Sequence, residues 1–456
     1  MIDLLGFALV LTLIASVGLR RSASSGDYIV ASRELTLLPL VATLVMTEFN
    51  TSTLLAFAAA GYAAGPMAIA LPAVFLVGLA FYTLTVARAW KRFDRLSVAE
   101  LFTVRYSPAL GRTASLLLLL AMVGFTATYV KSLTLLFVPF APSLPTPLLA
   151  ALLTLVVLGA VLPGGLVSVV RADLAGFAAT VVLFPLLLGI GWWRGGGWEG
   201  LASAFPADQL VLSPIAQWDH PALSMRFVTT LVVLTSFTYI AAPWYGQKIF
   251  AARDDRTAFR AVGLSAVLVF VLYGAVVLAA AFLRTEQPAL SDAQLAVPTM
   301  VRNWLPIGLR GAGFAVLFGA ALTTLAGVWS AMAAMVAADL VGERARSVRN
   351  QRLIISGFAL TSWLGATFLV DNILERLILA NIPVAALAFA LLAGFHWPRA
   401  TTRGAWASVI VGVVWGVGCF VVVGEAGGYT WPWAMYGIPL IFATGIGVSL
   451  AGAPSR

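Results

Sequence analysis

Long apolar runs follow one another along almost the whole chain and are separated by short polar connections. A helix that crosses a bilayer needs about 20 predominantly apolar residues, and on that basis the runs predict thirteen membrane-spanning helices. In lipid, backbone polar groups must be bonded within the segment, which favours helices. The predicted fold class is therefore an all-α integral membrane protein. The predicted helices cover residues 2–19, 38–63, 66–90, 113–139, 146–163, 172–193, 226–246, 259–283, 307–339, 353–370, 376–395, 404–424 and 433–453.

Two of these runs carry polar residues at the depth of the membrane centre. One contains the stretch Glu48–Thr53, and another contains two adjacent threonines, Thr323 and Thr324. Polar groups at this depth are tolerated only where protein or a water-filled cavity surrounds them. Oxygen ligands from two helices suit a hard cation such as sodium. The two interruptions together predict an ion-coupled carrier.

The helices also divide into two sets of five. An odd number of helices in each set gives the two sets opposite orientations, as in the inverted repeats of many secondary carriers. Each set should begin with a broken helix, and the predicted breaks lie at Glu48–Thr53 and at Pro243, which follows the polar run Thr235–Tyr239. The whole chain then forms a single transmembrane domain. Its predicted parts are an extra N-terminal helix at 2–19, repeats at 38–193 and 226–395, and two C-terminal helices at 404–453.

Composition and charge support a membrane protein and set its orientation. The chain is 61% hydrophobic and 10% charged, with a mean hydropathy of +0.97. Of the 28 basic residues, 21 fall on alternate loops that share one face, which the positive-inside rule assigns to the cytoplasm. This distribution explains the net charge of +9 without a nucleic-acid partner. The N-terminus is expected outside and the C-terminus inside. Cys419, as the single cysteine, excludes an internal disulfide.

Five short fragments, taken in order, resemble the sodium:solute symporter family. The resemblance runs from about residue 25 to 405 and implies a leucine-transporter-like fold, with one helix before and two after a five-plus-five repeat. It also implies sodium-driven symport by alternating access, in a plasma membrane that is expected to be a bacterial inner membrane. The fragments are Ser25-Gly26-Asp27-Tyr28 with Arg33; Ser97-Val98-Ala99-Glu100-Leu101 with Arg105-Tyr106; Gly164-Gly165-Leu166-Val167-Ser168 with Asp173; Gly246-Gln247 with Arg253; and Trp397, Arg399, Thr401 and Gly404-Ala405.

The resemblance implies a sodium site at the two polar interruptions. Thr323 and Thr324 fall where hydroxyl groups bind sodium in the family. The carbonyl ligands implied by the resemblance belong to Met46, Phe49 and Ala320. The alternative is that both threonines simply bond back to carbonyl groups four residues earlier in their helix.

Glu48 is a functional candidate because an ionised carboxylate inside the membrane costs at least a few kcal/mol unless it is paired. It is similar in position to an aspartate of the sodium/proline carriers. It either assists sodium entry, binds a cationic group of the substrate or carries a proton, or it is a protonated structural residue bonded to a neighbouring helix. Asn50, Ser52 and Thr53 either line the same cavity or face neighbouring helices.

The remaining candidates each have a functional and a structural interpretation. Thr128 and Lys131 lie in the fourth predicted helix, where Lys131 either attracts an anionic substrate or extends to the outer interface. Trp244 and Tyr245 either contact substrate or belong to an interfacial aromatic belt. Asp173 either lies on the ion-release path or provides a negative charge at the start of a helix.

The function expected from the sequence is sodium-coupled import of a small polar organic solute. The solute is expected to bear a carboxylate, as an amino acid or organic acid does, although a neutral sugar or nucleoside stays open. The coupling ion is Na⁺, one per cycle; no transition metal and no enzymatic activity are expected. The alternatives are a solute-sensing membrane module that acts with a separate signalling partner, and a proton-coupled carrier that uses Glu48.

Overall fold

The computed structural model describes residues 2–18, 33–95, 97–162, 165–342, 345 and 347–452. This described part of the chain is built of helices, and its only strand-like feature is an isolated parallel bridge between Leu35 and Ala252. The fragment Ser25–Tyr28 and Gly164 lie outside the described residues.

Each of the thirteen predicted segments contains at least one helix. The helices are α1 (Ile2–Gly18), α3 (Leu37–Glu48), α4 (Thr51–Ala64), η2 (Gly65–Ile69), α5 (Ala70–Thr85), α6 (Ala87–Phe93), α7 (Glu100–Arg105), α8 (Pro108–Phe137), η3 (Val138–Phe140), α9 (Thr146–Val161), α10 (Gly165–Arg194), α11 (Gly197–Ala204), α12 (Ala207–Leu210), α13 (Met225–Tyr239), α14 (Pro243–Phe250), α15 (Asp255–Glu286), η4 (Ala293–Leu295), α16 (Ala296–Trp304), α17 (Leu309–Met335), η5 (Val336–Val341), α18 (Val348–Phe368), α19 (Ile373–Leu379), α20 (Ile382–Ala385), α21 (Ala388–His396), α22 (Thr402–Val423) and α23 (Thr430–Ala451).

Length and composition support fewer complete spans than thirteen. Among the described residues, seven helices are long and apolar enough to cross a membrane, and nine are if each bent pair counts as one span. Three shorter apolar helices lie at Ile2–Leu13, Leu37–Glu48 and Thr146–Val161. An all-helical membrane fold is therefore confirmed, whereas the count of thirteen spans and the division into inverted repeats stay predictions.

Both predicted helix breaks are present, and a third one was not expected. The helix that starts at Leu37 ends at Glu48, and α4 starts at Thr51 after two non-helical residues. The chain bends by 47° between α13 and α14, and Pro243 is the first residue of α14, where its missing N–H has no helical partner to lose. The unexpected bend, of 45°, separates α19 and α20 from α21.

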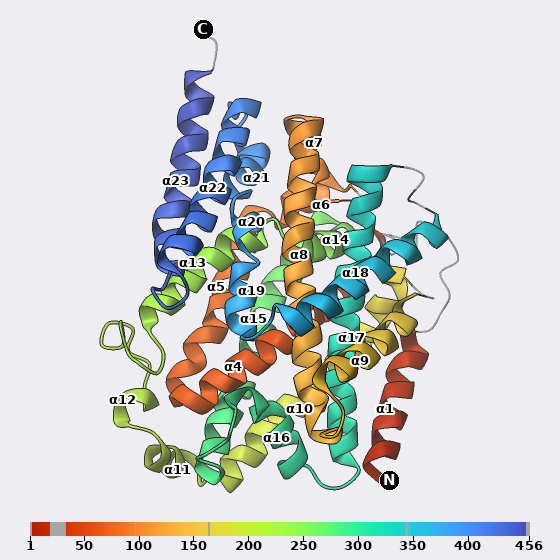
Figure 1. Ribbon diagram of the computed structural model, residues 1–456, viewed down its shortest axis with the longest axis vertical. Helices are drawn as coiled ribbons and strands as arrows, with labels where there is room; N and C mark the ends of the chain where they lie inside the picture. Colours follow the sequence, from red (N-terminus) through yellow and green to blue (C-terminus); the bar gives the residue numbers. More distant parts are fainter. Residues whose placement is uncertain are drawn as a thin grey trace.

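The helices pack around a central α15, which contacts α3, α4, α5 and α10 (Figure 1). Helix α1 lies on one side of the bundle against α17, and the α22–α23 pair lies on the opposite side. A hydrogen bond from the Gly308 N–H to Asp3 Oδ1 (2.6 Å) ties the start of α1 to the residue before α17. In the view of Figure 1, α1 begins at the lower end and α23 ends at the upper end.

Close packing of α4 on α15 depends on the absence of a side chain at Gly61. A Cβ atom built at this position would lie 2.3 Å from the Val277 carbonyl oxygen. That oxygen belongs to the backbone of α15, so it can move only if the two helices separate. Small residues at such contacts let helix backbones approach closely in a membrane protein.

We expect Gly61→Ala to lower the free energy of unfolding by about 1–3 kcal/mol, because the added methyl group overpacks the α4–α15 contact. Gly159→Ala is the matched control: Gly159 lies inside α9, and its Cβ would meet nothing within 4 Å. This control should be neutral or slightly stabilising. Thermal unfolding of the purified variants measures both effects, and equal melting temperatures for the two variants would contradict the packing argument.

Candidate functional site

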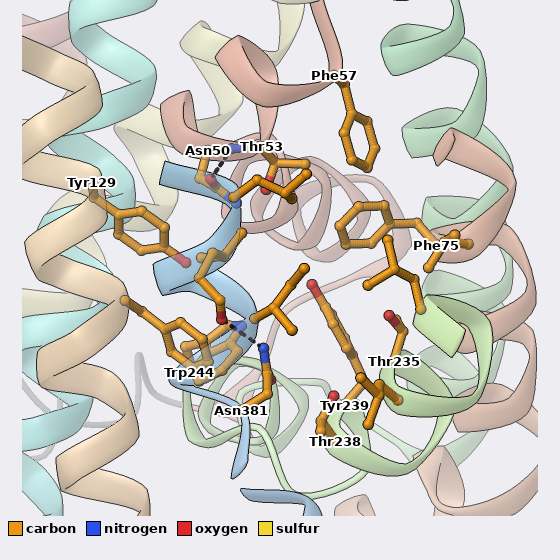
Figure 2. Close-up of a pocket in the computed structure, with 17 residues that line it drawn as sticks. Asn50, Thr53, Phe57, Phe75, Tyr129, Thr235, Thr238, Tyr239, Trp244 and Asn381 are labelled. Atoms are coloured by element: carbon orange, nitrogen blue, oxygen red, sulfur yellow. Dashed lines mark hydrogen bonds between the residues drawn. The ribbon is translucent and has the colours of Figure 1, made fainter. Parts of the chain in front are cut away.

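Three helix breaks meet around one cavity inside the bundle. Its volume is about 80 Å³. It is lined at the first break by Asn50 and at the second by Tyr239 and Trp244, and the third broken helix contributes Asn381, which lies between α19 and α20. Figure 2 shows Asn50 at one end of this cavity and Trp244 with Asn381 at the other. Polar groups from segments far apart in the sequence therefore line the same cavity.

The cavity has aromatic walls and a few uncharged polar groups. The described residues that line it include no charged side chain. This mixture is typical of small-molecule sites, but such sites usually measure about 300–1,000 Å³. An organic solute can therefore enter only if lining side chains or half-helices move. The aromatic lining residues are Phe57, Phe75, Phe125, Tyr129, Tyr239 and Trp244, and the polar ones are Asn50, Thr53, Thr235, Thr238 and Asn381.

Helix α4 points its N-terminus at the cavity. Asn50 is its N-cap, and the Asn50 Oδ1 accepts a hydrogen bond from the Thr53 N–H at 2.8 Å. Both residues also line the cavity. Because the N-terminus of a helix carries a partial positive charge, this end of the cavity favours an anionic group.

Glu48 lies next to the cavity but does not line it. Its side chain is 1% exposed, and its Oε2 accepts a hydrogen bond from the Tyr239 O–H at 2.5 Å. Its Oε1 has no hydrogen-bond partner among the described residues. The Glu48 carbonyl oxygen accepts from the Tyr273 O–H at 2.6 Å. Since Tyr239 does line the cavity, its phenol connects the carboxyl group to the cavity wall.

Oxygen atoms from two helices meet at the predicted sodium site. The Thr324 Oγ1 lies 2.9 Å from the Ala320 carbonyl oxygen and 3.2 Å from the Met46 carbonyl oxygen. The Thr323 Oγ1 lies 3.3 Å from the Ala320 oxygen. The Thr324 hydroxyl group therefore contacts a carbonyl one turn earlier in its own helix and also a carbonyl in the last turn of α3. Phe49 leaves the helical conformation there, with a ψ of 57°.

Several predicted site residues face neighbouring helices and not the cavity. The Ser52 Oγ donates to Thr128 Oγ1 (3.3 Å) or to Ser132 Oγ (3.1 Å), and Thr51 Oγ1 lies 2.7 Å from Ser132 Oγ. These hydroxyl groups connect α4 to α8. Lys131 is absent from the lining residues, since it lies two positions after Tyr129 on the same helix and so on a different face.

Trp244 and Tyr245, the two candidates at the start of α14, lie in different surroundings. Trp244 lines the cavity, and its ring lies edge-on to that of Phe125, with centroids 5.0 Å apart. Tyr245 is fully buried and packs against Tyr82 at 5.2 Å. Both side chains are inside the bundle, so neither belongs to an interfacial belt.

Asp173 does not lie at a helix start, which corrects one prediction. Helix α10 begins at Gly165, so the carboxylate is well inside the helix and does not offset the dipole of its first turn. The Asp173 Oδ2 instead forms a buried ion pair with Lys248 Nζ at 2.9 Å. Sequence reasoning missed this pair, although a lysine near the end of an apolar helix signals a partner, because a buried charge must be paired.

Sequence reasoning also missed most of the cavity wall. Thr235, Thr238 and Tyr239 belong to the polar run before Pro243, and that run was a detectable signal. Asn381 is a single amide in an apolar stretch. Its Nδ2 donates to the Leu377 carbonyl at 2.9 Å, at the junction of α19 and α20 in the helix whose bend hydropathy did not reveal.

Comparisons with known proteins identify the family of this chain. The model of the family described as "Sodium:solute symporter family" matches residues 28–412. The chain belongs to the sodium:solute symporter family. It is therefore a membrane transporter and not an enzyme.

Two relatives of this symporter are sodium/pantothenate symporters. The one from Escherichia coli is 26% identical over 419 residues, which cover 88% of this chain and 86% of the relative. The one from Haemophilus influenzae is 24% identical over 421 residues, which cover 88% and 84%.

Solved structures share the fold at low identity. A Na⁺-coupled sialic acid symporter, in a substrate-bound outward-open state, matches with a TM-score of 0.82 and 17% identity, over 100% of this chain and 99% of that one. A manganese transporter from Eremococcus coleocola matches with a TM-score of 0.54 and 13% identity, over 95% and 94%.

Asn50 has two separable roles, one as a helix cap and one as a cavity amide. We expect Asn50→Ala to lower the free energy of unfolding by about 1 kcal/mol, because the Thr53 N–H loses its acceptor. Asn50→Ser should keep the stability, since serine caps equally well, but should weaken solute binding because the cavity loses the amide. Thermal unfolding and solute-binding measurements on both variants check this. Full solute affinity in Asn50→Ser would exclude the amide as a binding group.

Proposed function

We propose that this symporter couples the inward movement of one sodium ion to that of a small polar solute bearing a carboxylate. The observation that carries the proposal is the approach of Thr324 Oγ1 to the Met46 carbonyl at 3.2 Å. It joins a continuous helix to the end of a broken one, beside a cavity that three broken helices line. The affinity for an ion bound at this junction would depend on the position of α3, the half-helix that precedes the break at Asn50.

The proposed sodium ligands are the hydroxyl oxygens of Thr323 and Thr324 and the carbonyl oxygens of Met46, Phe49 and Ala320. Support comes from the contacts between the Thr324 hydroxyl and two of these carbonyls, because oxygen ligands suit a hard cation. A bound ion would hold the end of α3 against α17 and so fix the N-terminus of α4 at the cavity. The membrane potential then adds about 2.3 kcal/mol per charge per 100 mV.

The solute site follows from the chemistry of the cavity. A carboxylate would lie at the N-terminus of α4 beside Asn50, where the helix dipole favours negative charge. Hydroxyl and amide groups of the solute would bond Thr235, Thr238 and Asn381 at the other side, between aromatic walls. Pantothenate, an acid with an amide and hydroxyl groups, has this chemistry, and the two relatives are named for it. It is the first solute to test.

The same proposal sets the topology. The positive-inside rule would place the basic loops and the C-terminus in the cytoplasm and the N-terminus outside, in a bacterial inner membrane. The opposite ends at which α1 begins and α23 ends support this arrangement. Residues 38–193 and 226–395 would be the inverted repeats, each of which begins with a broken helix.

Sodium should stabilise the purified protein, and Thr324→Ala should remove that effect. At a sodium concentration of about 100 times Kd, binding adds about 2.7 kcal/mol to the free energy of unfolding. Thr324→Ser keeps the hydroxyl group and should keep the response. The measurement is thermal unfolding in sodium and in potassium, without and with pantothenate.

The unmodified protein should melt at a higher temperature in sodium than in potassium, and pantothenate should raise it further only in sodium. Equal melting temperatures in the two salts would refute the sodium assignment. Sodium-driven uptake into proteoliposomes then separates transport from sensing: solute binding without uptake would favour the solute-sensing module that acts with a signalling partner.

Proton coupling is the second candidate, because the Glu48 carboxyl group is buried and its Oε1 lacks a partner among the described residues. We expect that a proton gradient alone, in sodium-free vesicles, drives no solute uptake. We also expect Glu48→Gln to retain sodium-dependent stabilisation, since it keeps an acceptor for Tyr239. Uptake that is driven by the proton gradient and abolished in Glu48→Gln would contradict sodium coupling and assign the proton to Glu48.

A further inference from the structure

A second group of oxygen atoms surrounds a cation within the bundle, and that cation is a side chain. Lys248 and Asp173 are 3% and 0% exposed and form an ion pair at 2.9 Å. The Lys248 ammonium also donates to the Thr43 carbonyl at 2.9 Å and to Thr47 Oγ1. Each of its three N–H groups therefore has an oxygen acceptor. We refer to the oxygen atoms of Thr43, Thr47 and Asp173 as the α3–α10 cage.

The cage does not depend on the helix that supplies the cation. Thr43 and Thr47 belong to α3 and Asp173 belongs to α10, whereas Lys248 enters from α14. Hydrogen bonds that do not involve the lysine organise the cage: Thr43 Oγ1 donates to Asp173 Oδ2, and Thr47 Oγ1 donates to the Thr43 carbonyl at 2.7 Å. The oxygen atoms are thus arranged by α3 and α10 themselves.

The α3–α10 cage has the charge and the oxygen ligands to bind one monovalent cation. Asp173 is its only charged member, so one positive charge neutralises it. The Asp173 Oδ1 is buried and has no hydrogen-bond partner among the described residues, which leaves a further ligand available. Carboxylate, carbonyl and hydroxyl oxygens are the ligands that hard cations take, and here an ammonium group occupies their centre.

The cage is next to the proposed sodium site. Thr43 and Thr47 flank Met46 on α3, whose carbonyl oxygen Thr324 approaches. The Met46 side chain itself lies against α10, where its Sδ is 3.7 Å from Thr180 Oγ1. A cation in the cage and a sodium ion at Thr324 would therefore act on the same few residues of α3.

We propose that the Lys248 ammonium is a built-in second cation, which fills the α3–α10 cage in place of a second sodium ion and so limits coupling to one sodium per cycle. This inference rests on the proposed sodium-coupled function. It makes Lys248 a residue that determines ion stoichiometry. Without the ammonium, the buried Asp173 carboxylate has no counter-charge, and a free monovalent cation supplies it.

The test counts sodium ions on the purified full-length chain. In the unmodified protein, radioactive sodium should bind with one ion per chain. Lys248→Met removes the charge and keeps an unbranched apolar stem. In this variant a second ion should bind, and at saturating sodium the slope of the unfolding free energy against RT ln[Na⁺] should rise from about 1 to about 2.

Two controls separate charge from structure. The double variant Lys248→Met with Asp173→Asn removes both charges, so it should return to one sodium ion. Lys91→Met removes a lysine that pairs with Asp94 at 3.3 Å and bonds the Phe250 carbonyl at the end of the same α14. It should keep one sodium ion. A purely structural role of Lys248 would change stability but not the number of bound ions.

The outcomes distinguish this inference from the function on which it rests. No bound sodium in the unmodified chain would overturn the sodium-coupled function itself. Two bound ions in the unmodified chain, or a single ion in folded Lys248→Met, would overturn only the inference. If Lys248→Met folds neither in sodium nor in potassium while the charge-neutral double variant folds, the cage does not accept sodium and the inference is wrong.

Discussion

Lipid offers no hydrogen bonds to an interrupted helix, so each break in this bundle must find its partners in protein. At the break after α3, the Glu48 carbonyl accepts a hydrogen bond from the Tyr273 O–H. At the break after α13, the Ile240 carbonyl accepts a hydrogen bond from the Trp90 indole N–H at 2.9 Å. In the third broken helix, the Asn381 amide donates to the Leu377 carbonyl at the junction of α19 and α20. Each interruption is tolerated because it is surrounded by the rest of the bundle.

The same constraint explains why the breaks converge. Broken helices that are buried together share polar partners and a space that lipid does not reach. The ends they expose there carry partial charges, so the space that satisfies the backbone also attracts a polar solute. In this symporter the cavity of about 80 Å³ is lined by aromatic side chains, with Phe125, Tyr129 and Trp244 among them. This volume is smaller than that of usual small-molecule sites, so a solute can enter only if these side chains or the half-helices that carry them move.

Helix α3 concentrates the charged and polar contacts of the core. Along its last two turns, Thr43 and Thr47 contact the Lys248–Asp173 pair. The Met46 carbonyl contacts Thr324, and the Glu48 carboxyl group accepts from Tyr239. Removal of one partner of this buried pair would leave the other charge unpaired, which costs about 3–5 kcal/mol. Lys248 of α14 thus contacts both α3 and α10 through groups whose loss is costly. Movement of α3 during transport would have to change the partners of these groups together.

The sequence by itself determined the membrane environment, the order of the helices and two of the three breaks. The hydropathy of a segment and the backbone restriction at Pro243 are local, so they do not depend on which helices pack against them. The sequence marked Asn50, Thr53 and Trp244 as candidates but left open whether they line a cavity, and the structure has all three on its wall. The family resemblance implied that Thr323 and Thr324 meet the end of α3; Thr324 contacts the Met46 carbonyl there, and sodium binding by the two threonines stays a proposal.

Only the tertiary structure decided which polar groups meet. Tyr239 and Glu48 are 191 residues apart, and Lys248 and Asp173 are 75 residues apart. No local pattern marks such partners, because they are set by the crossing of helices and not by the periodicity of either one. The fold also turned Ser52 and Thr128 toward each other and moved Asp173 from a predicted helix start into the core. Hydropathy fixes where a helix lies in the membrane, but packing against its neighbours fixes the direction in which each side chain points.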